Sequence, residues 1–147
     1  MSDDLQFIHE AYLLAKKGFD EGGLPIGAVL VKDGAILGRG HNQRVQQNDP
    51  TAHGEIDCIR NAGRQQNYKS TTLYTTLTPC LMCSGAIIHL GIPRVVIGDN
   101  QNFDGNEDFL RSNGVRVDLL EYQPCVELMA KFKDDHQKLV LEDFGQR

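Results

Sequence analysis

Two short stretches, Thr51–Ala52–His53–Gly54–Glu55 and Thr78–Pro79–Cys80–Leu81–Met82–Cys83, decide how this chain folds. The first supplies an imidazole followed two residues later by a carboxylate, and the second supplies two thiols at helical spacing. His53, Cys80 and Cys83 make three ligands, which leave a tetrahedral zinc ion with an open fourth position for water. A carboxylate beside that water completes the groups needed for hydrolytic attack. We therefore predict a catalytic Zn²⁺ site with Glu55 as its general acid and base.

The spacing within each stretch is consistent with one shared site. Cys80 and Cys83 lie three residues apart, so on a helix they share a face. In the first turn, the unpaired N–H groups and the helix dipole favour thiolate over thiol. His53 and Glu55, two residues apart, would point about 200° apart in the middle of a helix. Both can reach one metal only beyond a helix N-terminus, so we expect two helix N-termini to converge on the zinc.

Two other interpretations of the cysteine pair are weaker. A closed structural zinc site needs four ligands, and the remaining candidates are scattered: His9, His41, His89, His136, Cys58 and Cys125. A redox pair would leave His53 and Glu55 without a role. We expect Cys58 and Cys125 to be buried, reduced thiols that serve packing.

Length and charge limit the class of protein. The 147 residues suit one domain, 1–147, with 40% hydrophobic and 24% charged residues. The net charge of −5 disfavours a nucleic-acid partner, so we expect a small-molecule substrate. No apolar stretch reaches membrane-spanning length, and the acidic start, 1–4, is unlike a signal peptide. We expect no membrane partner and a cytoplasmic location.

The hydrophobic pattern predicts helices alternating with strands after one hairpin. A hairpin turn is expected at Asp33–Gly34, and Gly38 and Gly40 in the returning strand permit close backbone approach. The expected helices are 5–20, 52–61, 79–90, 107–112 and a last one from 124 to about 133; the expected strands are 26–31, 35–44, 70–76, 94–97 and 115–119, with a polar loop at 46–50. This order predicts an α/β fold with a mixed, five-stranded sheet covered by helices on both faces.

With these motifs in place, the chain resembles the cytidine deaminase superfamily, and more closely the fungal-type cytosine deaminases. The H-x-E…P-C-x-x-C pattern is the signature of zinc deaminases. The resemblance also covers 21–27, 38–42, 53–56, 72–77, 85–88 and the closing residues 142–145. It implies a three-layer helix–sheet–helix sandwich, a homodimer, and conversion of cytosine to uracil with release of ammonia. The apolar stretch 86–88 could serve the interface or the core.

The resemblance also implies which residues contact the substrate, a free nucleobase. Asn42 would hydrogen-bond the ring edge, and the Gly54 N–H would meet the ring carbonyl. Phe103 would stack on the ring, Asp143 would accept a hydrogen bond from a ring N–H, and Thr78 would also line the pocket. Glu55 would protonate the ring nitrogen and then the departing ammonia.

One departure from the fungal pattern concerns substrate identity. Val140 stands where those enzymes carry tryptophan, and the chain has no Trp. We therefore expect a less aromatic lid and a roomier pocket. A guanine deaminase and a tRNA adenosine deaminase would use the same zinc chemistry, although the acidic charge argues against RNA. A non-catalytic zinc-stabilised binding module is the alternative from another class, but it gives Glu55 no role.

Overall fold

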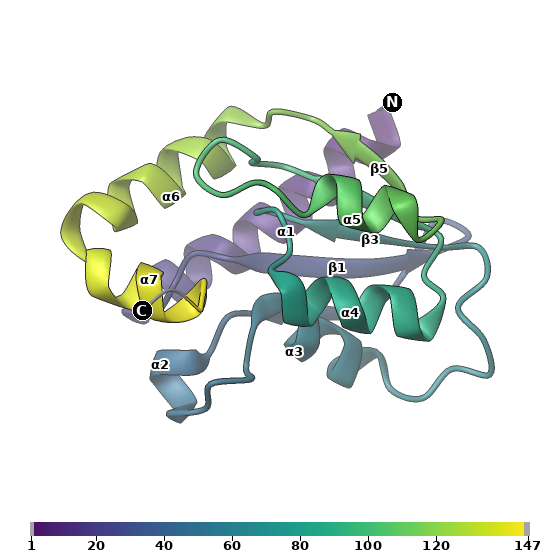
Figure 1. The fold of residues 1–147 in the computed structure, drawn as a ribbon, viewed down its shortest axis with the longest axis horizontal. Helices are drawn as coiled ribbons and strands as arrows, with labels where there is room; N and C mark the ends of the chain where they lie inside the picture. Colours follow the sequence, from purple (N-terminus) through teal and green to yellow (C-terminus); the bar gives the residue numbers. More distant parts are fainter. Residues whose placement is uncertain (1, 146–147) are drawn as a thin grey trace.

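A five-stranded sheet lies between two layers of helices in the computed structural model, which describes residues 2–145 (Figure 1). The elements in chain order are α1 (Ser2–Asp20), β1 (Gly27–Lys32), β2 (Ala35–His41), α2 (Arg44–Gln47), α3 (Gly54–Ala62), β3 (Thr71–Thr75), α4 (Leu81–Leu90), β4 (Arg94–Ile97), α5 (Glu107–Ser112), β5 (Arg116–Leu119), α6 (Gln123–Asp135) and α7 (Gln137–Asp143). The predicted α/β sandwich with a mixed sheet is confirmed. Within residues 2–145, no helix has both the length and the apolarity to cross a membrane.

The sheet has the strand order β2-β1-β3-β4-β5. β1 runs antiparallel to β2 and β3, whereas β3, β4 and β5 run parallel. Parallel strands are covered on both faces, because the crossover helices that join them must pack somewhere. This explains why Arg94–Ile97 is a short, continuously apolar stretch: Val95, Val96 and Ile97 are all buried.

Alternate residues of each strand enter different cores. Ala28 and Leu30 of β1 face α3, α4 and α5, where Cys58, Ile87 and Leu110 pack against them. Val29 and Val31 face α1, with Phe7, Ile8 and Ala11. A third cluster joins the start of β1 to α6 and α7; it comprises Leu24, Ile26, Leu77, Met129, Phe132 and Val140. Helices therefore cover both faces, and α7 adds a layer at one end of the sheet.

Two glycines let α3 approach β2 more closely than any larger residue would. A Cβ added at Gly38 would lie 2.6 Å from the backbone nitrogen of Ala62, and one added at Gly40 would overlap the backbone of Asp57 and Cys58. This confirms the close backbone approach expected at these positions. The approach fixes where α3 begins, and therefore where His53 and Glu55 lie.

Several expected boundaries are wrong, and the sequence predicted neither α2 nor α7. The first helix begins at Ser2 instead of Leu5. The returning strand ends at His41 instead of Arg44, because the Asn42 Oδ1 accepts a 3.1 Å hydrogen bond from the Arg44 N–H and turns the chain into α2. That helix occupies the start of the expected loop. The helices expected from 52 and 79 begin at Gly54 and Leu81, because the residues before them, His53 and Cys80, are extended N-caps.

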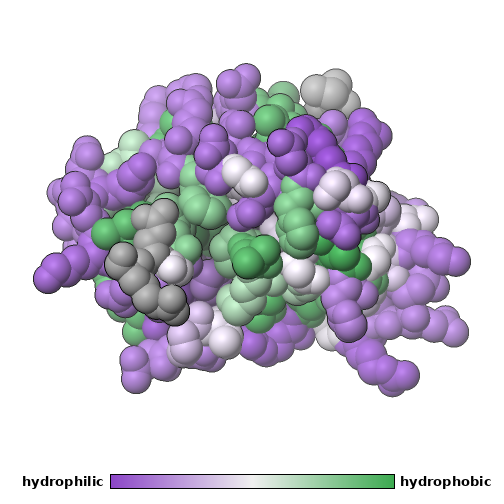
Figure 2. All heavy atoms as spheres, in the orientation of Figure 1, coloured by the Kyte–Doolittle hydropathy of each residue, from purple (hydrophilic) through white to green (hydrophobic). Residues whose placement is uncertain are grey.

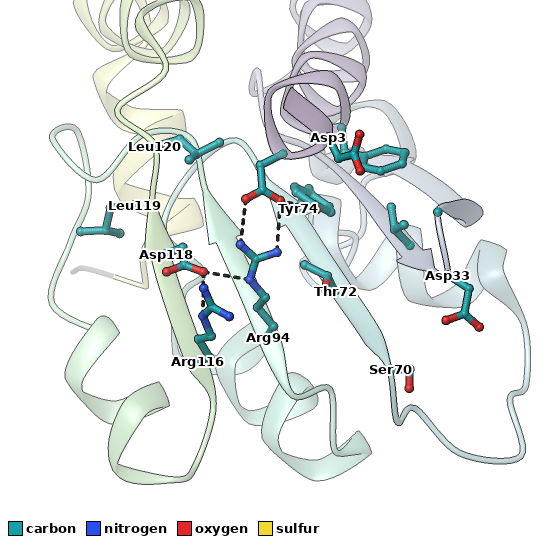
Figure 3. A pocket seen from close by; sticks show the side chains of 14 residues that line it. Asp3, Asp33, Ser70, Thr72, Tyr74, Arg94, Arg116, Asp118, Leu119 and Leu120 are labelled. Atoms are coloured by element: carbon teal, nitrogen blue, oxygen red, sulfur yellow. Dashed lines mark hydrogen bonds and ion pairs between the residues drawn. The ribbon is translucent and has the colours of Figure 1, made fainter. Parts of the chain in front are cut away.

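A charged network connects α1 with the parallel strands β3, β4 and β5 (Figure 3). Arg94 donates two hydrogen bonds to Asp4 of α1, 2.8 and 3.1 Å long, and a third of 2.8 Å to Asp118. The Tyr74 hydroxyl donates a further bond of 2.6 Å to Asp4. These groups line a cavity of about 590 Å³. Glu55 belongs to α3, which packs on the other face of the sheet from α1, so we assign this network to the fold and not to the metal site.

Candidate active site

The three predicted metal ligands come together. One ligand atom from each of His53, Cys80 and Cys83 lies within 4.8 Å of the other two, and His53 Nδ1 is 3.4 Å from the Cys80 sulfur. A tetrahedral zinc with bonds of about 2.0–2.3 Å needs its ligand atoms roughly 3.5 Å apart. Thiolate and imidazole are also the donors that zinc prefers. Both the geometry and the chemistry of this donor set fit Zn²⁺.

The charges of the three ligands suit a divalent cation. A hydrogen bond from Cys83 is the main cause that lowers the pKa of Cys80 to about 4, and the same bond raises the pKa of Cys83. Burial by itself would lower the pKa of His53, but the hydrogen bond with Cys80 and the charge of Asp143 raise it to about 9. The cluster therefore holds protons that a metal would displace on binding, because metal ligands must be deprotonated.

Glu55 is a buried carboxylate beside this cluster. Its side chain lies in the first turn of α3 and lines a small chamber together with His53 and Cys80. The Thr75 hydroxyl donates a 3.2 Å hydrogen bond to Glu55 Oε2 and so orients the carboxylate. Burial, followed by the charge of Cys80, raises the pKa of Glu55 to about 7. A group with such a pKa can both accept and donate a proton near neutral pH.

Asp143 lines the other side of the chamber, and Asn42, about a hundred residues away in the chain, bonds to it without lining the chamber itself. Asn42 Nδ2 donates a 2.8 Å hydrogen bond to Asp143 Oδ1, and the same oxygen lies 3.6 Å from His53 Nε2. Both residues are buried. Burial raises the pKa of Asp143, against the opposing effects of His53, Asn42 and Arg44. The pair presents an amide and a carboxyl group beside the metal cluster.

Phe103 and Phe144 close the chamber. Their ring centroids lie 4.2 Å apart, and the chamber that they border measures about 10 Å³, which is the space of one water molecule. The expected roomier pocket stays a prediction, because a second cavity of about 500 Å³ also reaches His53, Cys80 and Asp143. Val140 packs into the core instead of lining the chamber, and Phe144 supplies the aromatic ring. The small chamber itself cannot hold a nucleobase while both rings keep these positions.

The other expected contact residues lie at or just behind the chamber wall. Thr78 lines it, and its amide donates a 3.0 Å hydrogen bond to the carbonyl of Asp99. Gly54, Asn42 and Cys83 lie one layer back. A Cβ at Gly54 would meet the Ile26 carbonyl oxygen at 2.9 Å, so packing by itself requires glycine there. Its predicted hydrogen bond to a ring carbonyl stays a prediction.

The chain is similar to a known protein family and to known enzymes. The family model described as the cytidine and deoxycytidylate deaminase zinc-binding region matches residues 1–99. The chain belongs to this deaminase family. The cytosine deaminase of Candida albicans is 46% identical over 147 residues, which cover 98% of each chain. This confirms the resemblance to the superfamily and to the fungal cytosine deaminases.

Relatives that act on tRNA are also similar to this deaminase. A tRNA-specific adenosine deaminase of Buchnera aphidicola is 37% identical over 97% of this chain and 95% of its own. A solved structure from a study of A-to-I editing by tRNA:A34 deaminases has a TM-score of 0.69 and 33% identity over 79% of this chain and 98% of that chain. The zinc-dependent deaminase fold is therefore shown, and the choice of substrate depends on residues around the chamber.

Sequence reasoning missed three residues of this deaminase site: Thr75, Phe144 and Arg44. Thr75 was assigned only to a strand, although the last residue of a parallel strand commonly faces a site. Phe144 directly follows Asp143, an expected substrate contact, and this neighbouring position could have identified it as a site residue. Arg44 was expected at a strand end, and no signal in the sequence connects it with α7.

Proposed function

We propose that this protein hydrolyses the free base cytosine to uracil and ammonia. The observation that carries the proposal is the buried Glu55 carboxylate beside a three-ligand His/Cys/Cys cluster. The cytosine deaminase that is 46% identical over its full length supports the same substrate. A zinc ion held by His53, Cys80 and Cys83 would lower the pKa of a coordinated water toward neutrality.

In this proposal, Glu55 carries the protons. Its carboxylate takes one proton from the attacking water and delivers it to the ring nitrogen next to the amino-bearing carbon. It then takes the second proton from the hydroxyl now on that carbon and passes it to the amino group, which leaves as ammonia while the carbon becomes a carbonyl. The hydrogen bond from Thr75 keeps one carboxylate oxygen oriented throughout. A pKa near neutrality suits both steps, because an acid–base group works best when its pKa lies near the operating pH.

The remaining groups of the chamber would hold the base. Asn42 offers a donor and an acceptor to the ring edge, and Asp143 accepts a hydrogen bond from the ring N–H that a nucleoside lacks. Phe103 stacks on the ring, while Phe144 closes the chamber against water. Thr78 and the Gly54 N–H complete the wall. A carboxylate at the position where a nucleoside carries its sugar favours the free base.

An ammonia-release assay on four substrates tests the proposal. Cytosine, cytidine, guanine and a tRNA with adenosine at the wobble position are each supplied to the zinc-loaded protein. We expect cytosine to have the highest kcat/KM. The relationship to tRNA deaminases makes the tRNA the second candidate, and the net charge of −5 disfavours it. Faster turnover of tRNA, guanine or cytidine would overturn the assignment.

We also propose that the protein is a homodimer and that nucleic acid is not a partner. In Figure 2, apolar atoms gather near the middle of the drawn face, over the start of α4, with hydrophilic atoms around them. Leu81 and Met82 of α4 and Phe109 of α5 are exposed apolar side chains, whereas Ile87 is buried in the core. Such a patch on a chain of this size favours a partner surface.

Sedimentation velocity at micromolar concentration tests the dimer. We expect the wild-type protein to sediment as a dimer and Phe109→Glu to shift it toward monomer. Leu5→Glu, at an exposed leucine of α1 on the other layer, is the matched control and should remain dimeric. A monomeric wild-type protein would contradict the proposal.

We propose, finally, that residues 1–147 form a single zinc-dependent deaminase domain, which one continuous sheet supports. The expected cytoplasmic location stays a prediction.

A further inference from the structure

The Arg44 side chain, at the first residue of α2, lies against the end of α7. Only 14% of the side chain is exposed; its Nε lies 3.9 Å from Asp143 Oδ1 and its Nη1 lies 3.9 Å from Glu142 Oε1. Arg44 and Glu142 border both of two outer cavities, of about 500 and 330 Å³. The larger one also reaches His53 and Cys80. The guanidinium therefore stands at the mouth of the site and connects α2 with α7.

The Nε–H group of Arg44 is a donor that forms no hydrogen bond with the described residues, although its nitrogen is buried. Leaving a buried donor unpaired costs free energy, more so when the donor is charged. A movement of about 1 Å would bring Nε within the 2.7–2.9 Å of a charge-assisted bond to Asp143. Active-site hydrogen bonds that are long in the free enzyme often tighten in the complex.

The main chain of Arg44 acts on the same pair of residues. Its N–H donates a 3.1 Å hydrogen bond to Asn42 Oδ1, and Asn42 Nδ2 in turn donates a 2.8 Å bond to Asp143 Oδ1. With its oxygen held by Arg44, the amide must direct its NH₂ group at the carboxylate. Arg44 therefore constrains Asp143 from two directions, through its guanidinium and through Asn42.

The charge around Arg44 argues against a direct contact with an anionic substrate. Asp143 and Glu142 both face its guanidinium and balance its positive charge. A site for a nucleotide phosphate needs an unbalanced cation, and Arg44 does not offer one. The Arg44 side chain instead connects α2 with the end of α7 inside the protein.

We propose that Arg44 is a positioning residue, which holds the Asp143 carboxylate and the end of α7 in the orientation that binds the ring N–H of the base. The inference rests on the proposed function, because that function assigns Asp143 to the substrate. It adds a residue of α2 that determines how tightly the base is bound without touching it.

Kinetics and binding of Arg44 variants test the proposal. Arg44→Ala should raise KM for cytosine about tenfold or more and lower kcat by less than threefold, with zinc content unchanged. Arg44→Lys keeps the charge and should recover part of the loss. Glu127→Gln, at an exposed residue of α6 that the proposal does not involve, is the matched control and should leave KM within twofold. Unchanged KM in Arg44→Ala would overturn the proposal.

A double-mutant cycle separates positioning from a general structural effect. The probe is uracil, the product of the proposed reaction, and its Kd is measured by calorimetry. Arg44→Ala should weaken binding about tenfold in the wild-type background and less than threefold in Asp143→Asn, because residues that act through each other are not additive. Equal fold-changes in both backgrounds would contradict an action through Asp143.

Amide hydrogen exchange gives a readout independent of substrate. Arg44→Ala should speed exchange in α7 at least fivefold and leave α6 unchanged, since the guanidinium pairs with Glu142 and Asp143 of α7. Equal exchange in both proteins would overturn the inference. A wild-type protein that neither turns over cytosine nor binds uracil would instead overturn the proposed function. The hydrogen-exchange result would still show whether the Arg44 side chain stabilises α7.

Discussion

His53 Nδ1 lies 3.4 Å from Cys80 Sγ, and these two residues are the N-caps of α3 and α4. Two helix N-termini therefore meet at the metal cluster, each with unpaired N–H groups that favour negative charge. The arrangement stabilises thiolate ligands and any negative charge that develops on oxygen at the site. It also makes the cluster a bridge between two helices.

Zinc removal should affect both activity and stability. We expect one zinc per chain by elemental analysis, and loss of that zinc in the Cys80→Ser/Cys83→Ser double variant. Because the metal binds the folded state, chelation should also lower the melting temperature. Cys58→Ala, which removes a buried thiol outside the cluster, is the control and should keep its zinc. Full zinc in the double variant would refute the ligand assignment.

Glu55→Gln should abolish most of the activity while the fold persists. Glutamine keeps an oxygen to accept the Thr75 hydrogen bond, so zinc content and melting temperature should stay close to wild type. It cannot carry a proton, and general acid–base catalysis contributes typically about 10²–10⁴-fold. We therefore expect kcat to fall at least about 100-fold in the ammonia-release assay.

The exposed Glu127 of α6 provides the control for this change of charge. Glu127→Gln should leave kcat within twofold of wild type. Near-normal turnover by a zinc-loaded Glu55→Gln protein would remove Glu55 from the chemistry.

Gly40→Ala should destabilise the fold strongly. The added methyl group would overlap the backbone of α3, which cannot move without displacing His53 and Glu55. We expect a loss of about 3 kcal/mol or more in the free energy of unfolding, at the upper end of overpacking effects. Urea denaturation measures it. Gly85→Ala is the control: a Cβ there meets nothing within 4 Å, and alanine favours the helix.

Arg94→Ala should destabilise the fold in a pH-dependent manner. Hydrogen bonds from Arg94 lower the pKa of Asp4 below its ordinary value, despite burial (Figure 3). A group with a lowered pKa adds stability above its unfolded pKa of about 4, and this contribution is lost as the pH falls through the folded value. We expect Arg94→Ala to cost about 2–3 kcal/mol at pH 7, since Asp4 then lacks its partner.

Urea denaturation at several pH values checks this prediction. The difference in the free energy of unfolding between wild type and Arg94→Ala should shrink as the pH falls below about 4. Arg116→Ala, at a side chain 70% exposed, is the control and should cost less than about 1 kcal/mol. A difference in unfolding free energy that grows toward acid pH would contradict the role assigned to Asp4.

The sequence alone predicted the residues of the His/Cys/Cys cluster, the sheet and the class of chemistry. Ligand identity and helix spacing are local properties, so His53, Cys80 and Cys83 could be assigned without coordinates. Apolar runs bounded by glycine and proline predicted the strands, and β4 and α5 were predicted at the observed residues. The predicted ends of helices and strands were wrong where a side chain caps or turns the backbone, as Asn42 does before Arg44.

Only the tertiary structure decided how the chamber is closed. The contacts of Asn42 with Asp143, of Phe103 with Phe144 and of Arg44 with α7 join segments from 41 to 101 residues apart. No local pattern encodes such contacts, because they depend on where α7 packs against the sheet. For the same reason the replacement of tryptophan by Val140 suggested a larger pocket, whereas the fold turns Val140 into the core and places Phe144 over the site. Ligand type follows from residue identity, but pocket size follows from which side chains the packing of distant elements directs inward.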